Sequence, residues 1–399
     1  MKNNKQPYTI HLGFSGFPRG TASVQRTRLT FKGLALCGHQ PLIINKISHH
    51  EKGYTKKIAH TADQIRIVNT AWLPYRPDSF IARNINKLSG YVGEFLFLVK
   101  KRKQIKTAIV YSNYFAEFPY YWMLSKILGF KLIHQYVEFF SKIPGRNSFF
   151  TRLNDRLIDY HIQHYCDGII GISNYLIQHI QTKAPNKPII KLPAVCDFDE
   201  LKTIPLSEEG PFIMYCGTIY YEAVIEFIID IFDRLKKDCV YDGKLMLVIS
   251  GNQDGDWDQL QQRLNQSPAK DLIIVKNNIP YSTLLSLYKT ADLLLIPLRN
   301  TIQDIARFPH KVGEYTAAGR PVVSTNVGEL KQYFTDGENA LLTDEYDLDQ
   351  YVQKIKSVIT DPTKYNAIGN KGHELGLAKF DYHSQGKSLH QFIEQLHKK

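Results

Sequence analysis

The sequence lacks any long hydrophobic run. None of its apolar segments approaches the roughly 18 residues that a membrane-spanning helix needs, and the longest lie around Phe95–Val99 and Phe227–Phe232. The opening residues, 1–7, also lack the apolar stretch and small-residue cleavage site of a signal peptide. We therefore expect a cytoplasmic protein that spans no membrane.

Cysteine is sparse and scattered. The chain has five cysteines and no CxxC pair, which disfavours both a disulfide framework and a zinc site. They are Cys37, Cys166, Cys196, Cys216 and Cys239. We expect a reducing compartment and no bound metal.

Acidic residues are scarce in the first half and absent from the first fifty positions. Residues 1–200 hold 28 Lys and Arg against 12 Asp and Glu, a balance of +16, whereas residues 201–399 hold 22 against 26, a balance of −4. This asymmetry indicates two domains, the first facing an anionic partner such as lipid headgroups, a phosphorylated substrate or nucleic acid. The alternative is a basic surface that only aids solubility.

What the chain does contain is enough apolar sequence for real cores, since 43% of it is hydrophobic. Short apolar runs alternate with helical stretches, which predicts an α/β protein of two doubly wound parallel-sheet domains. The expected strands are Tyr8–Gly13, Pro41–Asn45, Ala108–Ser112, Lys131–Val137, Asp167–Ile172, Ile189–Leu192, Phe212–Gly217, Leu245–Ser250, Leu272–Val275, Asp292–Leu298, Pro321–Thr325 and Ala340–Leu342. Leu201–Pro211 is the expected linker, and Tyr382–Leu396 is a final helix that could pack on either domain.

A glycine-rich turn follows the first expected strand. Gly13, Gly16 and Gly20, with Arg19 between the last two, precede a helix whose N-terminus would favour an anionic ligand. The spacing is not GxGxxG, so a purely structural turn is the competing interpretation.

The strongest local signal is the segment from Arg307 to Val323. Pro309 at the first helical position and Gly319 just beyond the last bracket a helix of about three turns. Lys311 and Glu314 are three apart, hence neighbours on one helix face, where a cation suits a diphosphate and a carboxylate suits ribose hydroxyls. The alternative is an ordinary surface ion pair.

Other polar side chains are weaker candidates. Arg299 and Arg307 flank the loop before this helix and could reach a phosphate, or could be solvated. His134 ends a strand-like run and Glu138 follows it, so either could act at a cleft edge. A lone histidine is more often structural.

Two segments mix apolar and basic residues in the manner of membrane-surface helices. Leu88–Lys106 contains four successive basic residues, Lys100–Lys103, and Phe139–Arg156 contains four phenylalanines. The competing interpretation is an amphipathic helix that packs its apolar face on its own domain.

Six motifs in chain order resemble those of the family-4 glycosyltransferases (glycosyl transferases group 1). They are Leu36-Cys37-Gly38-His39, Asp167–Ser173, Met214–Thr218, Tyr288–Pro297, Phe308-Pro309-x-Lys311-x-x-Glu314-Tyr315 with Gly319 and Pro321–Val323, and Asp336–Leu342. The resemblance implies the GT-B fold, with two Rossmann-like domains facing a cleft. Residues 1–200 would form the acceptor side, 201–380 the donor side, and 381–399 a helix returning to the first domain.

The resemblance also implies an activity, the transfer of a sugar from a nucleotide sugar such as a UDP- or GDP-sugar to a hydroxyl acceptor. Retention, no metal and no resident cofactor are expected, with a saccharide or lipid-linked acceptor, cell-surface polysaccharide assembly and peripheral association with the inner face of the cell membrane. The expected catalytic residues are Lys311, Glu314, His134 and Arg307. The expected donor contacts are Gly16, Arg19, Gly20, Gly217, Thr218, Ile279, Pro280, Arg299, Phe308, Pro309, His310 and Tyr315.

The sequence departs from the family pattern at three places. Ala306 stands where a first glutamate, eight residues before Glu314, is usual, and Thr218 and Ala223 replace the common arginine and lysine that grip the diphosphate. Gln135 follows His134 where acidic residues are frequent.

Two other functions stay open on the sequence. One is a nucleotide-sugar epimerase or hydrolase of the same fold, which the missing glutamate disfavours. The other is a basic nucleic-acid binder, although no RRM, OB or helix-turn-helix pattern is present, and we expect no nucleic-acid partner.

Overall fold

The computed structural model describes residues 7–13, 17, 22–47, 50–251 and 254–398. The chain forms two compact units. The first comprises residues 1–195, 306–310 and 382–399, and the second comprises residues 196–305 and 311–381.

The first unit is built on an eight-stranded sheet in the order β3-β4-β2-β1-β5-β6-β7-β8. All neighbouring strands are parallel except the antiparallel pair β3 and β4. The strands are β1 (Tyr8–Gly13), β2 (Gln40–Asn45), β3 (Ile58–His60), β4 (Arg66–Asn69), β5 (Ile105–Tyr111), β6 (Lys131–Tyr136), β7 (Gly168–Gly171) and β8 (Ile189–Lys191). The expected strands of this half are therefore present, while β3 and β4 were missed because both are short and neither is a continuous apolar run.

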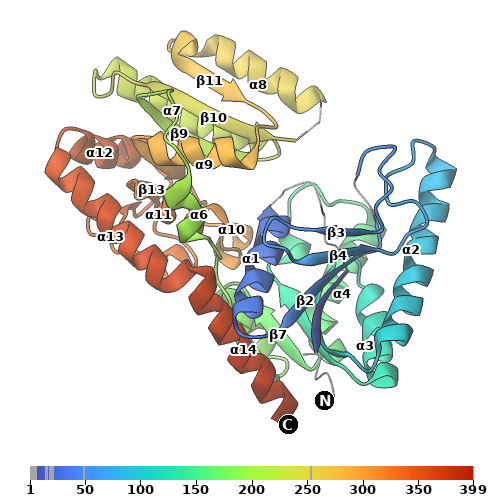
Figure 1. Cartoon of the computed structure of the whole chain (residues 1–399). Helices are drawn as coiled ribbons and strands as arrows, with labels where there is room; N and C mark the ends of the chain where they lie inside the picture. Colours follow the sequence, from blue (N-terminus) through green and yellow to red (C-terminus); the bar gives the residue numbers. More distant parts are fainter. Residues whose placement is uncertain (1–6, 14–16, 18–21, 48–49, 252–253, 399) are drawn as a thin grey trace. The chain divides into compact units, whose positions relative to one another are not determined.

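Helices cover both faces of this sheet. They are α1 (Ala22–Leu36), α2 (Phe80–Lys101), α3 (Glu117–Leu128), α4 (Phe149–His161), α5 (Asn174–Gln181) and α14 (Tyr382–Lys398). The helices α1 and α14 lie on one face, and α2 and α3 lie on the other (Figure 1). Right-handed crossovers between successive parallel strands place α4 and α5 on the same face as α2 and α3.

The last helix, α14, packs closely on α1. Gly33 and Gly386 face each other, and a Cβ on Gly33 would lie 2.8 Å from the Gly386 Cα. The absence of side chains lets the two backbones touch, so the C-terminal helix belongs to the core of the first unit.

The second unit has a six-stranded, wholly parallel sheet in the order β11-β10-β9-β12-β13-β14. Its strands are β9 (Phe212–Thr218), β10 (Lys244–Ser250), β11 (Ile273–Lys276), β12 (Leu293–Ile296), β13 (Val322–Thr325) and β14 (Leu341–Thr343). Its helices are α6 (Phe198–Thr203), α7 (Glu222–Lys237), α8 (Asp254–Gln266), α9 (Tyr281–Thr290), α11 (Lys311–Ala317), α12 (Leu348–Ile359) and α13 (Pro362–Phe380), and the short α10 (Ile302–Ala306) crosses the boundary between the units. All six expected strands of this half are present, and the segment expected to be a linker begins inside α6.

Strand order in this unit identifies where a ligand would bind. From β9 the chain proceeds outward to β10 and β11, then returns to the other side of β9 as β12. The carboxyl ends of β9 and β12 therefore flank the point at which strand order reverses, the usual ligand position in an open α/β sheet. Within the described residues, no helix combines the length and the apolar character needed to cross a membrane.

Candidate functional site

The reversal point of the second sheet carries the two residues of the strongest sequence signal. Helix α11, which is labelled in Figure 1, follows β12 and the short α10 in the chain. It begins at Lys311. The Lys311 ammonium donates to the Cys216 carbonyl at the end of β9 and lies 4.4 Å from the centre of the Tyr215 ring. A cation is thus held at the carboxyl end of β9, where an anionic ligand would neutralise it.

Glu314 lies one turn further along α11 and is 5% exposed. Its Oε1 accepts a hydrogen bond from the Tyr281 hydroxyl at 2.8 Å. Burial raises the pKa of Glu314 to about 7, even though the Tyr281 hydrogen bond and the charge of Lys311 both lower it. A carboxyl group that titrates near neutral pH, beside a fixed cation, is typical of a functional site.

The end of β9 and the segment before α9 adjoin Lys311 and Glu314. Gly217 and Thr218 end β9, and both are half-buried. A Cβ on Gly217 would collide with the Tyr215 ring, so only glycine fits there. Ile279 and Pro280 lie just before α9, next in the chain to Tyr281, which places this predicted base wall beside Glu314.

Tyr315 is buried and acts as an anchor. It is 0% exposed, and its hydroxyl accepts a hydrogen bond from the Cys216 amide at 3.2 Å. The ring therefore ties α11 to β9 and leaves no surface for the donor contact predicted from the sequence. Direct contact was predicted because sequence spacing alone does not distinguish the inward side of a helix from the ligand side.

The helix α11 is also shorter than expected. It spans seven residues, Lys311–Ala317, so Phe308, Pro309 and His310 precede it instead of forming its first turn. The predicted end is confirmed, because Gly319 has φ +70° and terminates the segment. This conformation strongly favours glycine.

Arg299 is not a free phosphate ligand in the structure. Its Nε donates to Asp304 Oδ2 at 3.1 Å, and its backbone amide donates to the same oxygen at 3.0 Å. Asp304 is 0% exposed, so the pair fixes the loop after β12. A hollow of about 460 Å³ lies beside this loop, lined by residues that follow β13 and β14, among them Asn326, Gly328 and Lys331.

The other predicted residues belong to the first unit or lie outside the described residues. Residues 306–310, which include Arg307 and His310, group with the first unit, where the Ser173 hydroxyl donates to the Ala306 carbonyl at 2.5 Å. Gly16, Arg19 and Gly20 lie outside the described residues.

His134 is a core residue. It is 0% exposed, its Nε2 is 2.7 Å from the Tyr165 carbonyl, and its ring packs edge-on against Phe118. Burial lowers the pKa of His134 to about 3. The sequence had suggested that His134 ends its strand. Strand β6 instead continues two residues beyond it to Tyr136, so this histidine lies inside the sheet.

Comparison with known proteins finds a family match for part of the chain. Residues 197–375 match the family described as glycosyl transferases group 1. A D-inositol 3-phosphate glycosyltransferase of Catenulispora acidiphila is 28% identical over 119 residues, which is 30% of this chain and 27% of that protein. The matched region thus spans about a quarter of this curated relative.

Solved structures share the fold at low sequence identity. A sucrose-phosphate synthase from Thermosynechococcus elongatus has a TM-score of 0.75 at 17% identity, covering 99% of this chain and 100% of that one. Anabaena HepE in complex with UDP-glucose has a TM-score of 0.66 at 12% identity, covering 98% and 99%. Residues 197–375 thus match the glycosyl transferases group 1 family, and the two parallel-sheet domains have the GT-B fold.

Proposed function

We propose that the protein is a glycosyltransferase that moves a sugar from a nucleotide-sugar donor to a hydroxyl acceptor. The observation that carries the proposal is the pairing of Lys311 and Glu314 at the reversal point of the second sheet, with Tyr281 donating to Glu314. The family match over residues 197–375 supports it independently.

The two charged side chains bind different parts of the donor. Lys311 neutralises the diphosphate, and the ionised Glu314 accepts hydrogen bonds from the ribose hydroxyls. Gly217 and Thr218 border the diphosphate at the end of β9. Ile279 and Pro280 face the base.

Transfer needs no nucleophile from the protein. The bond between the anomeric carbon and the diphosphate oxygen breaks, and a new bond forms from that carbon to the acceptor oxygen. The acceptor approaches the anomeric carbon on the face from which the diphosphate departs and passes its proton to that diphosphate, and this same-face route retains the anomeric configuration. Negative charge grows on the diphosphate in the transition state, so Lys311 contributes most when the charge is greatest.

The donor and acceptor follow from family likeness and charge. Solved neighbours include Anabaena HepE bound to UDP-glucose and TarM bound to UDP and α-GlcNAc-glycerol. We therefore infer a uridine diphosphate hexose or N-acetylhexosamine as donor. The acceptor is a lipid-linked saccharide used in cell-surface polysaccharide assembly, which the +16 balance of residues 1–200 supports.

The test is a thermal-shift panel of UDP, GDP, ADP, CMP and their common sugar conjugates. A ligand at about 100 times its dissociation constant adds about 2.7 kcal/mol of stability. We expect one base to stand out and its response to be lost in Glu314→Ala. A flat panel with folded protein would contradict the proposal, and donor hydrolysis without any acceptor requirement would instead support the epimerase or hydrolase alternative.

A further inference from the structure

Helix α2 exposes its apolar side. Seven of its apolar residues are between 43% and 73% exposed. They are Phe80, Ile81, Ile85, Leu88, Val92, Phe95 and Leu96. Five of them, from Ile81 to Phe95, follow one another at spacings of four and three residues, which places them on one stripe, and Phe80 and Leu96 adjoin its two ends. A surface helix normally turns such a stripe toward its own core.

The side of α2 that packs on the sheet is largely polar, although it ends on the buried Leu98. Asn86 accepts a hydrogen bond from the Leu73 amide at 2.8 Å, and the Ser89 hydroxyl accepts one from the Trp72 amide at 3.0 Å. Gly90 touches backbone directly, since a Cβ there would lie 2.0 Å from the Lys46 carbonyl oxygen. Hydrogen bonds and backbone contact therefore attach this helix.

A buried charged cluster completes the attachment. Glu94 is 0% exposed and accepts from the Tyr121 hydroxyl at 2.9 Å. Lys46 lies 2.6 Å from Glu117 and 4.5 Å from the centre of the Tyr91 ring. These contacts attach α2 through its inward side, and the exposed apolar stripe on its outward side is left for a partner.

The charges around the stripe identify the partner. Between Asp78 and Glu117 the chain has a single acid, Glu94, and that acid is buried. The basic residues of the same stretch are Arg83, Lys87, Lys100, Lys101, Arg102, Lys103 and Lys106. A second copy would bring two such basic faces together, whereas an anionic bilayer complements both the charge and the apolar stripe.

Helix α4 presents aromatic side chains from the same face of the sheet. Phe149 and Phe150, at its first turn, are 74% and 80% exposed. Both α2 and α4 follow strands whose carboxyl ends lie at one edge, so both helices begin at that edge. The aromatic pair is therefore a second exposed apolar feature on the face of the sheet that carries α2.

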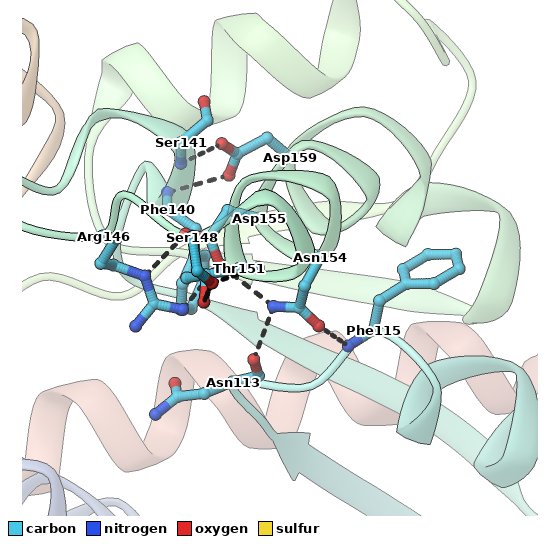
Figure 2. Close-up of polar contacts among 10 residues, drawn as sticks. All are labelled: Asn113, Phe115, Phe140, Ser141, Arg146, Ser148, Thr151, Asn154, Asp155 and Asp159. Atoms are coloured by element: carbon cyan, nitrogen blue, oxygen red, sulfur yellow. Dashed lines mark hydrogen bonds and ion pairs between the residues drawn. The ribbon is translucent and has the colours of Figure 1, made fainter.

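The base of α4 is held firmly (Figure 2). Arg146 binds Asp155 through two hydrogen bonds of 2.6 and 2.7 Å. Asn154 accepts from the Phe115 amide at 2.8 Å, and Asp159 accepts from the Phe140 amide at 3.0 Å. Three sets of hydrogen bonds therefore hold the helix that carries the exposed aromatic pair.

We propose that the outward stripe of α2, together with Phe149 and Phe150, is the membrane-contact surface of the protein. It lies flat in the interfacial layer of an anionic bilayer, with Lys100–Lys103 against the headgroups. Only one part of this proposal rests on the proposed function, namely that the protein meets a lipid-linked acceptor at the membrane. Vesicle binding itself requires no transfer reaction.

The test uses the whole chain and flotation with mixed vesicles of phosphatidylcholine and phosphatidylglycerol. The perturbing variant is Leu88→Glu with Leu96→Glu, and its matched control is Leu36→Glu, a leucine of similar exposure (60%) on α1, across the sheet. We expect wild type and control to bind equally and the double variant to bind at least tenfold less. Neutralising Lys100 and Lys101 to Gln should weaken binding about fivefold each and reduce its salt dependence.

Each other outcome overturns the membrane proposal. Wild type that does not bind the vesicles, or a double variant that binds like wild type, removes this surface from membrane contact. A dimer in lipid-free sedimentation that the double variant abolishes assigns the stripe to self-association. A normal donor thermal shift in the double variant shows that it is folded, and it separates failure of this proposal from failure of the enzymatic one.

Discussion

Replacing Glu314 with Gln should change how the stability of the protein depends on pH. The carboxyl group is buried beside Tyr281, and burial raises its pKa from an ordinary 4.5 to about 7. A tenfold change in proton affinity corresponds to about 1.4 kcal/mol, so the raised pKa represents a difference on the order of 3 kcal/mol between the two protonation states.

The sign follows from proton binding. The folded protein holds this proton more tightly than the unfolded chain does between the two pKa values. The contribution of Glu314 to the free energy of unfolding is therefore greatest below 4.5, falls as the pH rises toward about 7, and is constant above that. Glutamine keeps an acceptor for the Tyr281 hydroxyl and does not ionise, so the variant lacks this decline.

Urea unfolding of both proteins, from about pH 5 to about pH 8, measures the effect. The difference between them cancels every titrating group that they share. We expect Glu314→Gln to gain stability relative to wild type as the pH rises. A difference that stays constant across the range would refute the assignment of this proton to Glu314.

The same proton links donor binding to pH. If the ionised carboxylate receives the ribose hydroxyls, donor affinity falls about tenfold for each pH step of one below a pH of about 7. Calorimetric titration at several pH values should show this slope in wild type. A slope that survives in Glu314→Gln would contradict the link.

Three further changes test the packing around the two units. Tyr281→Phe should lower the free energy of unfolding by about 1 kcal/mol and raise the pKa of Glu314 further, because it removes the 2.8 Å hydrogen bond; unchanged urea unfolding would contradict this. Gly33→Ala should destabilise by about 1–3 kcal/mol in thermal unfolding, since its Cβ would lie 2.5 Å from a backbone oxygen of α14, and a neutral effect would show that α1 and α14 can separate. Arg146→Met leaves Asp155, 1% exposed, without its two-point partner and should cost about 1–3 kcal/mol, whereas wild-type stability would show that water replaces the arginine.

Periodicity predicted the fold well because parallel strands covered on both faces are apolar at nearly every position. All twelve expected strands are present, and β12 is buried along its whole length. The edge strand β3 and its neighbour β4 escaped detection because both are short. Their sequences, Ile58–His60 and Arg66–Asn69, have no apolar run longer than two residues.

The candidate site was predictable only in part. Spacing identified Lys311 and Glu314, but no pattern signals that Tyr281, 33 positions earlier, donates to Glu314. Nor does spacing show whether a side chain points into the core or toward a ligand. For that reason Tyr315 and His134 were expected at a surface, whereas both lie in the core. The stripe of α2 shows the same limit of sequence reasoning. Amphipathicity alone does not say which side of a helix faces the protein, and here the apolar side faces outward.

The most direct test of the central claim is the turnover of Lys311→Ala with the nucleotide sugar that the thermal-shift panel selects. Lys244→Ala is the matched control, because this exposed lysine begins β10 and so lies at the opposite edge of the sheet. Electrostatic stabilisation of the departing diphosphate predicts at least a tenfold loss of kcat/KM in Lys311→Ala, equivalent to about 1.4 kcal/mol, and none in the control. Equal turnover in wild type and Lys311→Ala would contradict the assignment of the donor site to the end of β9.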